Sequence, residues 1–498
     1  MEANPPRSSP RPRPDSRTVV VGLLLVAGYL ATRLPGLATR LPIFLDEAIY
    51  MVWGWRLYEG EHVHRSLVSG KLLTVALTGL ALRLPADPLW TVRLSSVVAG
   101  AVTLAACYGV GLLLDGALAA TVAGLLCVVS PLAVLHDRLC LADNWLAAFS
   151  ALTLLLALRF TRRPSRVLAL LTALAMVAAV LAKVTGVVVV ATPLLAFLLL
   201  PRTPGAGRAL LWTYAPACVL LSGPLLIFSP AGEIRLHTAV GGRMNLIENL
   251  QHAGAWLLAY WTLPLALALL AALVFALARR PGPGRLLSAC ALAPVALVVL
   301  TSRYWTSRFL LATVVPVALI GGLAAAEVAR SRARRLLPLA ALLLIGPILF
   351  DAQILWQPGR APLPAYDREQ YWEGWTAGHG AREAAAWLAH EAAAAPRPTR
   401  VVAHAEPDQM NAPSRALRAL LARDEKVAFL ERDLGAISGS VDAWRGDKRP
   451  DLWLVAAADE RAPWFQALAP RLECLARFPP SGLPFVSFYR LRDAETAR

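Results

Sequence analysis

The sequence predicts a mainly α-helical, polytopic integral membrane protein with about 11 transmembrane helices. We also expect a long amphipathic first outer loop and a small C-terminal extracytoplasmic α/β domain. Three observations predict this architecture. Of the 498 residues, 57% are hydrophobic and only 16% are charged, against roughly a quarter charged in soluble domains. Apolar runs near the ~20 residues that cross a bilayer recur up to residue 351. Beyond that point, strand-like and helical segments alternate.

The apolar runs divide the chain into three parts. Residues 1–18, rich in proline and arginine, are predicted to be a disordered cytoplasmic tail. Residues 19–351 are expected to form the transmembrane module, and residues 352–498 the extracytoplasmic domain. The candidate spans are 19–35, 91–114, 117–135, 141–160, 166–182, 185–200, 209–229, 253–278, 286–301, 309–329 and 335–351.

The distribution of arginine predicts the orientation. With the N-terminus in the cytoplasm, the cytoplasmic segments hold 17 basic and four acidic residues. The opposite side holds 13 basic and nine acidic residues up to residue 350, and the rest of the chain is nearly neutral. Most of the formal net charge of +16 therefore follows the positive-inside rule. A nucleic-acid partner is excluded as the explanation of that charge.

Two segments on the outer side are large. The first outer loop, residues 36–90, is too long for a simple connection. Tyr50, Trp53 and Leu57 share a helical face there, and Leu67, Lys71 and Thr74 predict a second interfacial helix. In the tail, predicted strands at 400–403, 426–430, 452–456 and 485–490 alternate with helical stretches at 381–393, 414–423 and 464–468.

The cysteine pattern indicates neither a disulfide framework nor a metal site. The six cysteines show no CxxC spacing, and most lie in apolar runs. Glu61 with His62 and His64 is a weak metal-binding pattern. No cofactor is required, and a divalent metal is an open alternative.

Charged residues gather where the predicted spans meet the outer face. Asp46 and Glu47 follow the first span, and Lys71 lies later in the same loop. The further candidates follow other spans: Arg138, Asp143, Lys183, Arg303 and Arg308. Charge this close to hydrocarbon is costly and indicates function.

These residue types suit group transfer from an anionic lipid. Asp46 is placed to act as general base on an acceptor hydroxyl, with Glu47 as its supporting acid. Lys71, Lys183 and Arg308 are suited to hold a departing phosphate. Arg138 and Asp143 are expected to position the first loop or the sugar.

Each candidate also has a purely structural interpretation. Asp46 would then cap the interfacial helix, and Arg138 with Asp143 would be a pair that fixes a helix end. Lys183 would extend to the membrane interface. Arg303 and Arg308 are alternatives for one role. Convergence on one face favours the functional interpretation.

Six motifs, in order along the chain, resemble the GT-C superfamily of membrane glycosyltransferases. The resemblance is to the bacterial branch related to protein O-mannosyltransferases and the lipid A aminoarabinose transferase. The motifs are LDEAIY at 45–50, SGKL at 69–72, RLSS at 93–96, RLCLAD at 138–143, KVTG at 183–186 and RFL at 308–310. YWEGW at 371–375 resembles the segment that opens the extracytoplasmic tail in bacterial members. The family's Pro-Pro is missing after Lys71.

The resemblance implies an inverting enzyme of the bacterial inner or plasma membrane that acts on the outer face. Its partners would be a polyprenyl-phosphate sugar donor, an envelope acceptor with a hydroxyl (lipid, polysaccharide or protein) and membrane lipids. It assigns Asp46 to the active site, and some relatives bind a divalent metal. Two other classes stay open: a transporter or flippase of lipid-linked sugars, and a non-catalytic envelope assembly subunit.

Overall fold

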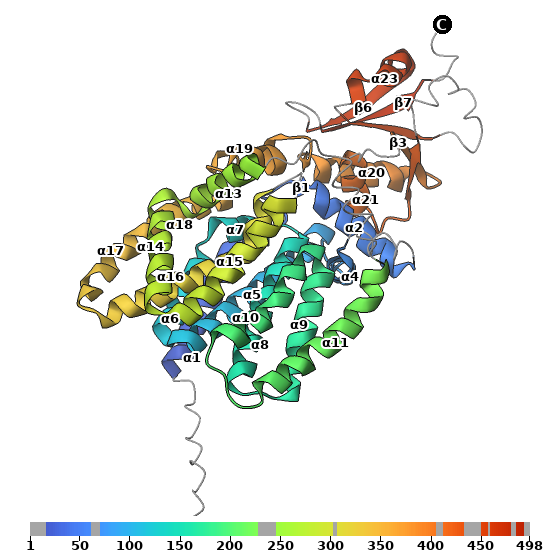
Figure 1. Ribbon diagram of the computed structural model, residues 1–498. Coiled ribbons are helices and arrows are strands. Elements are labelled where there is room, and N and C mark those ends of the chain that lie inside the picture. The colour runs from blue at the N-terminus through green and yellow to red at the C-terminus, as the bar shows by residue number, and fades with distance from the viewer. Residues whose placement is uncertain are drawn as a thin grey trace, which may run out of the picture.

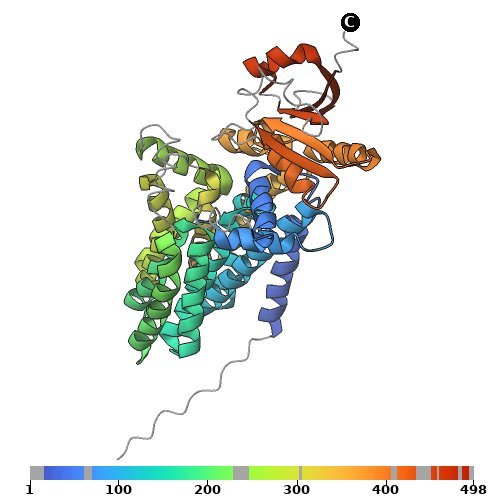
Figure 2. The ribbon, with the colours of Figure 1, turned by 90° about the vertical axis from the view of Figure 1, so that its right-hand side faces the viewer.

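The computed structural model describes residues 16–60, 70–227, 246–301, 306–404, 412–432, 450–456, 459–479 and 485–492. Helices form a bundle, and a β-sheet with its own helices lies across one end of it (Figures 1 and 2). Predicted residues outside the described part include Arg303, His62 and His64.

The bundle is built from long and short apolar helices in chain order. They are α1 (Ser16–Arg33), α5 (Pro88–Asp115), α6 (Ala117–Val128), α7 (Pro131–Asp137), α8 (Ala142–Arg162), α9 (Arg166–Ala182), η1 (Val184–Ala191), α10 (Thr192–Leu199), α11 (Ala206–Ile227), α13 (Leu246–Trp261), α14 (Leu263–Arg279), α15 (Pro281–Thr301), η2 (Ser307–Thr313), α16 (Val314–Arg330), η3 (Arg332–Leu336), α17 (Leu337–Ala341), η4 (Leu342–Leu344) and α18 (Ile345–Trp356).

Within the described residues, six helices are long and apolar enough to cross a membrane, or up to eight if each bent pair counts as one span. The count of about 11 spans therefore stays a prediction. The expected span at 253–278 is not one helix, because α13 and α14 meet at 108°. Thr262 between them has a φ of 57°, and Pro264 starts the new helix in its first turn. Apolar residues continue through this break, so hydropathy alone does not reveal it.

In its described residues, the predicted first outer loop contains the helices α2 (Leu45–Tyr58) and α4 (Leu72–Ala81). They pack on each other so closely that a Cβ on Gly54 would lie 2.7 Å from the backbone nitrogen of Gly79. The prediction placed Leu67, Lys71 and Thr74 on one face of the second helix. Helix α4 begins at Leu72, with Lys71 as its N-cap residue, so of these three only Thr74 lies within it. Asp46 is not a cap: Phe44 holds that position, and Asp46 lies in the first turn of α2.

The tail forms a five-stranded sheet in the order β4-β3-β5-β7-β6. Its strands are β3 (Thr399–His404), β4 (Val427–Arg432), β5 (Leu452–Ala456), β6 (Leu472–Phe478) and β7 (Val486–Leu491). β3 pairs in parallel with β4 and β5, whereas β7 is antiparallel to β5 and β6. One face of the sheet packs on α20 (Ala381–Ala394) and α21 (Ala412–Leu420), and the other packs on α23 (Pro463–Leu468).

Strand β6 was not among the predicted strands. It is an edge strand whose pairing shifts between Cys474 and Ala476. Most of its residues are exposed or half-buried, so its sequence lacks the alternation typical of a strand with one buried face.

The tail is joined to the first outer loop by backbone pairing and by side chains. β1 (Ile43–Phe44) pairs with β2 (Ala377–Gly378), and α21 packs against α2 (Figure 1). Arg382 also makes two contacts with the Asp87 carboxylate, the shorter at 2.6 Å.

A buried ion pair fixes the start of α2. Arg93 donates from Nε and Nη2 to the two carboxylate oxygens of Glu47, at 2.9 and 2.7 Å, and neither side chain is exposed. The remaining lone pairs of Glu47 accept the backbone N–H groups of Phe44 and Cys140, at 2.9 and 2.7 Å. The same arginine donates to the carbonyls of Leu37, Leu41 and Pro42.

Replacing Arg93 with Met should destabilise the protein by about 3–5 kcal/mol, because it leaves the Glu47 carboxylate buried without its partner. Thermal unfolding in detergent checks this. Arg397→Met is the control: Arg397 is 55% exposed in its pair with Asp451, so its loss should cost less than about 1 kcal/mol. Equal costs would contradict the prediction.

Candidate active site at the start of four helices

Four predicted residues meet in one ionic cluster. Arg308 Nη2 lies 2.7 Å from Asp46 Oδ2, and Arg308 Nε lies 3.8 Å from Asp143 Oδ2. Lys183 Nζ donates to Asp143 Oδ1 at 2.7 Å. Arg308 therefore stands between the two carboxylates, and Lys183 neutralises the second one.

Lys71 borders this cluster. Its ammonium lies 5.5 Å from the centre of the Tyr50 ring, and its charge acts on Asp46. Lys183 lies 3.7 Å from the centre of the Phe309 ring. With three cations and two carboxylates, the cluster carries a formal charge of +1.

The cluster lies where four helices begin. Asp46 and Asp143 are in the first turns of α2 and α8. Lys183 is the N-cap residue of η1, and Arg308 is in the first turn of η2. Helix N-termini carry partial positive charge and unpaired N–H groups, so their convergence adds to the attraction for an anion.

Asp46 is the more accessible of the two carboxylates. Its side chain is 23% exposed, whereas that of Asp143 is 5% exposed. Burial raises the pKa of Asp46, but the charges of Arg308 and Lys71 outweigh that effect and hold its pKa below the usual 3.8. Asp46 is therefore ionised at neutral pH, as a general base must be.

Arg308 retains unused donors. Among the described residues, its Nε and Nη1 atoms are buried without a hydrogen-bond partner. Among the same residues, the hydroxyl of Thr306 is also buried without a hydrogen-bond partner. Buried donors without partners are costly, so this part of the cluster is suited to receive a ligand with several acceptor oxygens.

The other predicted residues support the cluster instead of lining it. Glu47 is fully occupied by Arg93 and backbone N–H groups, which favours a positioning role. Arg138 is not paired with Asp143. It is buried, and it donates to the carbonyls of Arg33, Pro35 and Gly36 at 2.9–3.4 Å, which fixes the segment leading to Asp46. Lys183 is 7% exposed, and its ammonium is bound to Asp143.

The described part of the site does not fit a divalent metal. No group of three or more His, Cys, Asp or Glu side chains that could hold a metal occurs among the described residues. Asp46 and Asp143 are both committed to cationic side chains, which supply the positive charge here.

Three aromatic and acidic residues at the site were not predicted. The Tyr371 ring packs edge-on against Phe44, with centroids 4.9 Å apart, and its hydroxyl lies 3.3 Å from His136 Nε2. Tyr260 donates to Asp367 at 2.5 Å. Burial raises the pKa of Asp367 to about 6, against the lowering effects of Ser307, Tyr260 and Arg308. Only the YWEGW motif pointed to this region.

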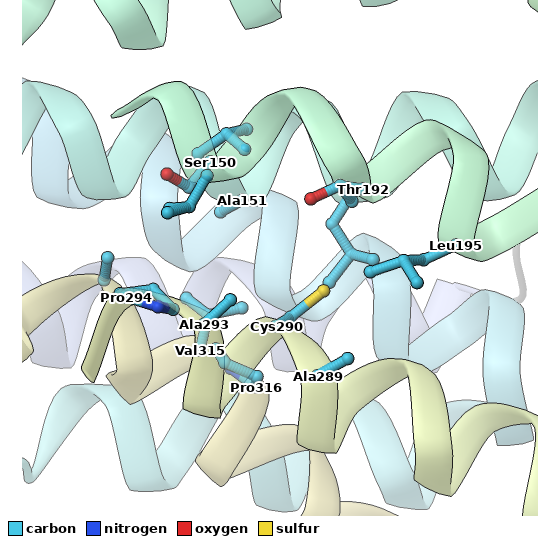
Figure 3. Close-up of a pocket in the computed structure, with 14 residues that line it drawn as sticks. Ser150, Ala151, Thr192, Leu195, Ala289, Cys290, Ala293, Pro294, Val315 and Pro316 are labelled. Atoms are coloured by element: carbon cyan, nitrogen blue, oxygen red, sulfur yellow. The ribbon is translucent and has the colours of Figure 1, made fainter. Parts of the chain in front are cut away.

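Two apolar cavities lie in the bundle beside the cluster. One is lined by Asp143 and Phe309, among others, and the other lies between α8, η1, α10, α15 and α16. The two cavities share the lining residues Ser150, Val188, Val189, Pro294 and Ala312. Figure 3 shows Ser150 and Thr192 on one wall of the second cavity, facing Pro294 and Cys290 on the other.

Comparison with known proteins identifies the fold. Residues 72–231 match the family model of dolichyl-phosphate-mannose-protein mannosyltransferases. No curated protein matches the sequence. ArnT from Cupriavidus metallidurans, solved bound to undecaprenyl phosphate, superposes with a TM-score of 0.64 at 16% identity, covering 96% of this chain and 98% of that one.

Two further structures have the same arrangement. The Archaeoglobus fulgidus oligosaccharyltransferase, in complex with Zn and sulfate, gives a TM-score of 0.58 at 11% identity and covers 95% of this chain and 73% of its own. The arabinofuranosyltransferase AftD from Mycobacteria gives 0.55 at 15% identity and covers 96% and 40%. The predicted resemblance is confirmed: this chain is a helical membrane protein with the fold of the GT-C glycosyltransferases.

Proposed function

We propose that this protein transfers a sugar from a polyprenyl-phosphate donor to a hydroxyl of an envelope acceptor on the extracytoplasmic face. The observation that carries the proposal is the position of Arg308. One of its nitrogens is bound to the candidate base Asp46, and among the described residues the other two are buried without a hydrogen-bond partner, near Asp143 and its partner Lys183. A single guanidinium thus reaches both the base and the place where an anion would bind.

The phosphate would bind to the unused side of Arg308. A guanidinium donates strong, charge-assisted hydrogen bonds to phosphate oxygens. Lys183 and Lys71 would add charge, and the four helix N-termini would favour the same anion. Nε and Nη1 lie on different edges of the guanidinium, so each would donate singly to a phosphate oxygen, and the contact of Nη2 with Asp46 need not break.

The transfer step then follows from the charges. Asp46 accepts the proton of the acceptor hydroxyl while the hydroxyl oxygen forms a bond to the anomeric carbon. The bond from that carbon to the phosphate oxygen breaks, and its electron pair leaves with the polyprenyl phosphate. The cations stabilise the negative charge that develops on the leaving oxygen, so no acid is needed there. Attack opposite the leaving group inverts the anomeric carbon.

The two apolar cavities support a lipid-linked donor. One of them reaches Asp143 of the ionic cluster, and both are lined mainly by alanine, valine, leucine and proline. A polyprenyl chain attached to the bound phosphate would find apolar surroundings from its first isoprene units. The comparison with ArnT bound to undecaprenyl phosphate agrees with this class of ligand.

The two other classes predict different behaviour. A transporter of lipid-linked sugars would move the donor without consuming it, and an assembly subunit would tolerate the loss of Asp46. Consumption of lipid-linked sugar by the purified protein in detergent, with a membrane extract as acceptor and no gradient, would be expected only of the enzyme.

Asp46→Asn should lower transfer about 10²–10⁴-fold, because the base is removed. Binding of undecaprenyl phosphate should not weaken, since the cations remain. Release of undecaprenyl phosphate from the sugar-loaded donor measures transfer. Glu59→Gln, at the other end of α2, is the control and should match the wild type. Full transfer by folded Asp46→Asn would refute the assignment.

Arg308→Gln should weaken binding of undecaprenyl phosphate by about 10–100-fold, as expected for lost hydrogen bonds between charged groups. Direct binding to the detergent-solubilised protein measures this. Arg202→Gln changes an exposed arginine beyond the end of α10 and should leave binding unchanged. Equal affinities for the two variants would contradict the proposed phosphate site.

The pH dependence of transfer should reflect the lowered pKa of Asp46. A base with a lowered pKa loses its charge only at lower pH, so protonation of Asp46 should not reduce transfer until the pH falls below the usual aspartate pKa of 3.8. In Lys71→Gln, one of the positive charges that lower the pKa of Asp46 is absent. The pH below which transfer falls should therefore be higher in this variant. Rates at saturating donor measure it, with Lys426→Gln in the tail as control. Identical limits in all three proteins would argue against Asp46 as base.

A further inference from the structure

Residues 365–378, here called the strap, connect the last described helix of the bundle to the sheet domain. The strap contains α19 (Ala365–Arg368), η6 (Glu369–Glu373) and β2. It is more than 300 residues away from Asp46 in sequence, yet it forms one side of the site. Arg368 in the strap binds the segment just before it, donating to the carbonyls of Gly359 and Ala361 at 2.9 and 2.5 Å.

The strap supplies backbone partners to the residues just before Asp46. In the β1–β2 pair, Ile43 is opposite Gly378 and Phe44 is opposite Ala377. The N–H of Leu45 donates to the carbonyl of Thr376 at 3.1 Å. Asp46 is the next residue, so the position of the first turn of α2 depends on this pairing.

The strap also reaches the partner of Asp46. Tyr371 is 2% exposed and packs edge-on against both Phe44 and His136, with ring centroids 4.9 and 5.5 Å apart. On the same Phe44 ring lies the guanidinium of Arg308, with its carbon 5.5 Å from the ring centre. Phe44 is thus held by Tyr371 and in turn supports Arg308.

Several contacts brace the strap itself. Tyr260 of α13 donates to Asp367 at 2.5 Å. Thr376 donates to the carbonyl of Gln370 at 2.7 Å, which closes the turn between η6 and β2. The tyrosine therefore projects from a segment fixed to the bundle at one end and to β1 at the other.

We infer that the strap sets the distance between Asp46 and Arg308, with Tyr371 and the β1–β2 pair as its positioning elements. This inference rests on the proposed function, since it assigns the strap a role in that reaction. Tyr371 acts through Phe44 and does not itself take a proton. Its ring matters more than its hydroxyl, whose contact with His136 is long at 3.3 Å.

Two substitutions test the strap. Tyr371→Ala removes the ring and should lower transfer at least about 30-fold, because displacement of a reacting group by ~1 Å costs on the order of 10²-fold. Tyr371→Phe keeps the ring and should stay within about threefold of the wild type. Gly378→Val should act like Tyr371→Ala, because its Cβ would lie 2.7 Å from Ile43 Cγ2 and 2.9 Å from the Ile43 carbonyl oxygen.

Matched controls separate positioning from general damage. Trp375→Ala changes a strap residue that is 61% exposed, and Gly254→Ala adds a Cβ where no atom lies within 4 Å. Both should transfer at the wild-type rate. Transfer, affinity for undecaprenyl phosphate and thermal unfolding would be measured on each full-length protein.

The outcomes distinguish the two proposals. Loss of transfer in Tyr371→Ala and Gly378→Val, with affinity within a few-fold and rescue by Tyr371→Phe, supports the strap. Wild-type transfer in both variants overturns it, as does a loss of transfer that only follows a loss of stability and affinity. If the wild type itself neither binds undecaprenyl phosphate nor consumes the donor, the proposed function fails instead.

Discussion

The site depends on the ion pair between Arg308 and Asp46, because a charge buried beside hydrocarbon must be matched by another charge. Arg308 neutralises Asp46 directly and lies near Asp143, which Lys183 neutralises in turn. A carboxylate can therefore stay ionised in a mostly buried position. The surplus of one positive charge suits an anion, so under the proposed function the same side chains meet the electrostatic requirements of folding and of ligand binding.

Around this cluster, buried arginines donate hydrogen bonds to backbone carbonyls as well as to carboxylates. Arg93 and Arg138 are both fully buried, and between them they bind six backbone carbonyls of residues 33–42. The segment before Asp46 has little regular structure, so its carbonyls would otherwise lack partners at the membrane boundary. The two arginines donate hydrogen bonds to these carbonyls and thereby fix the backbone of the loop.

The sequence allowed prediction of the residues whose charge is conspicuous in an apolar chain. Asp46, Asp143, Lys183 and Arg308 were identified in this way, and the structure brings all four together. It did not allow prediction of roles that depend on distant partners. The position of Arg138 on backbone carbonyls, the contact of Tyr371 with His136 across 235 residues and the break at Thr262 leave no local signal in composition or periodicity.

The pairing of β1 with β2 also has a consequence for biosynthesis. Asp46 emerges early from the ribosome, but the strand that fixes its position is made more than 300 residues later. Until then β1 has no partner and Phe44 lacks the ring that packs on it. The nascent chain can thus insert most of its helices while its reaction centre is still incomplete. If the proposed function holds, a chain truncated before Gly378 would lack the strand that positions Asp46 and would not consume donor lipid.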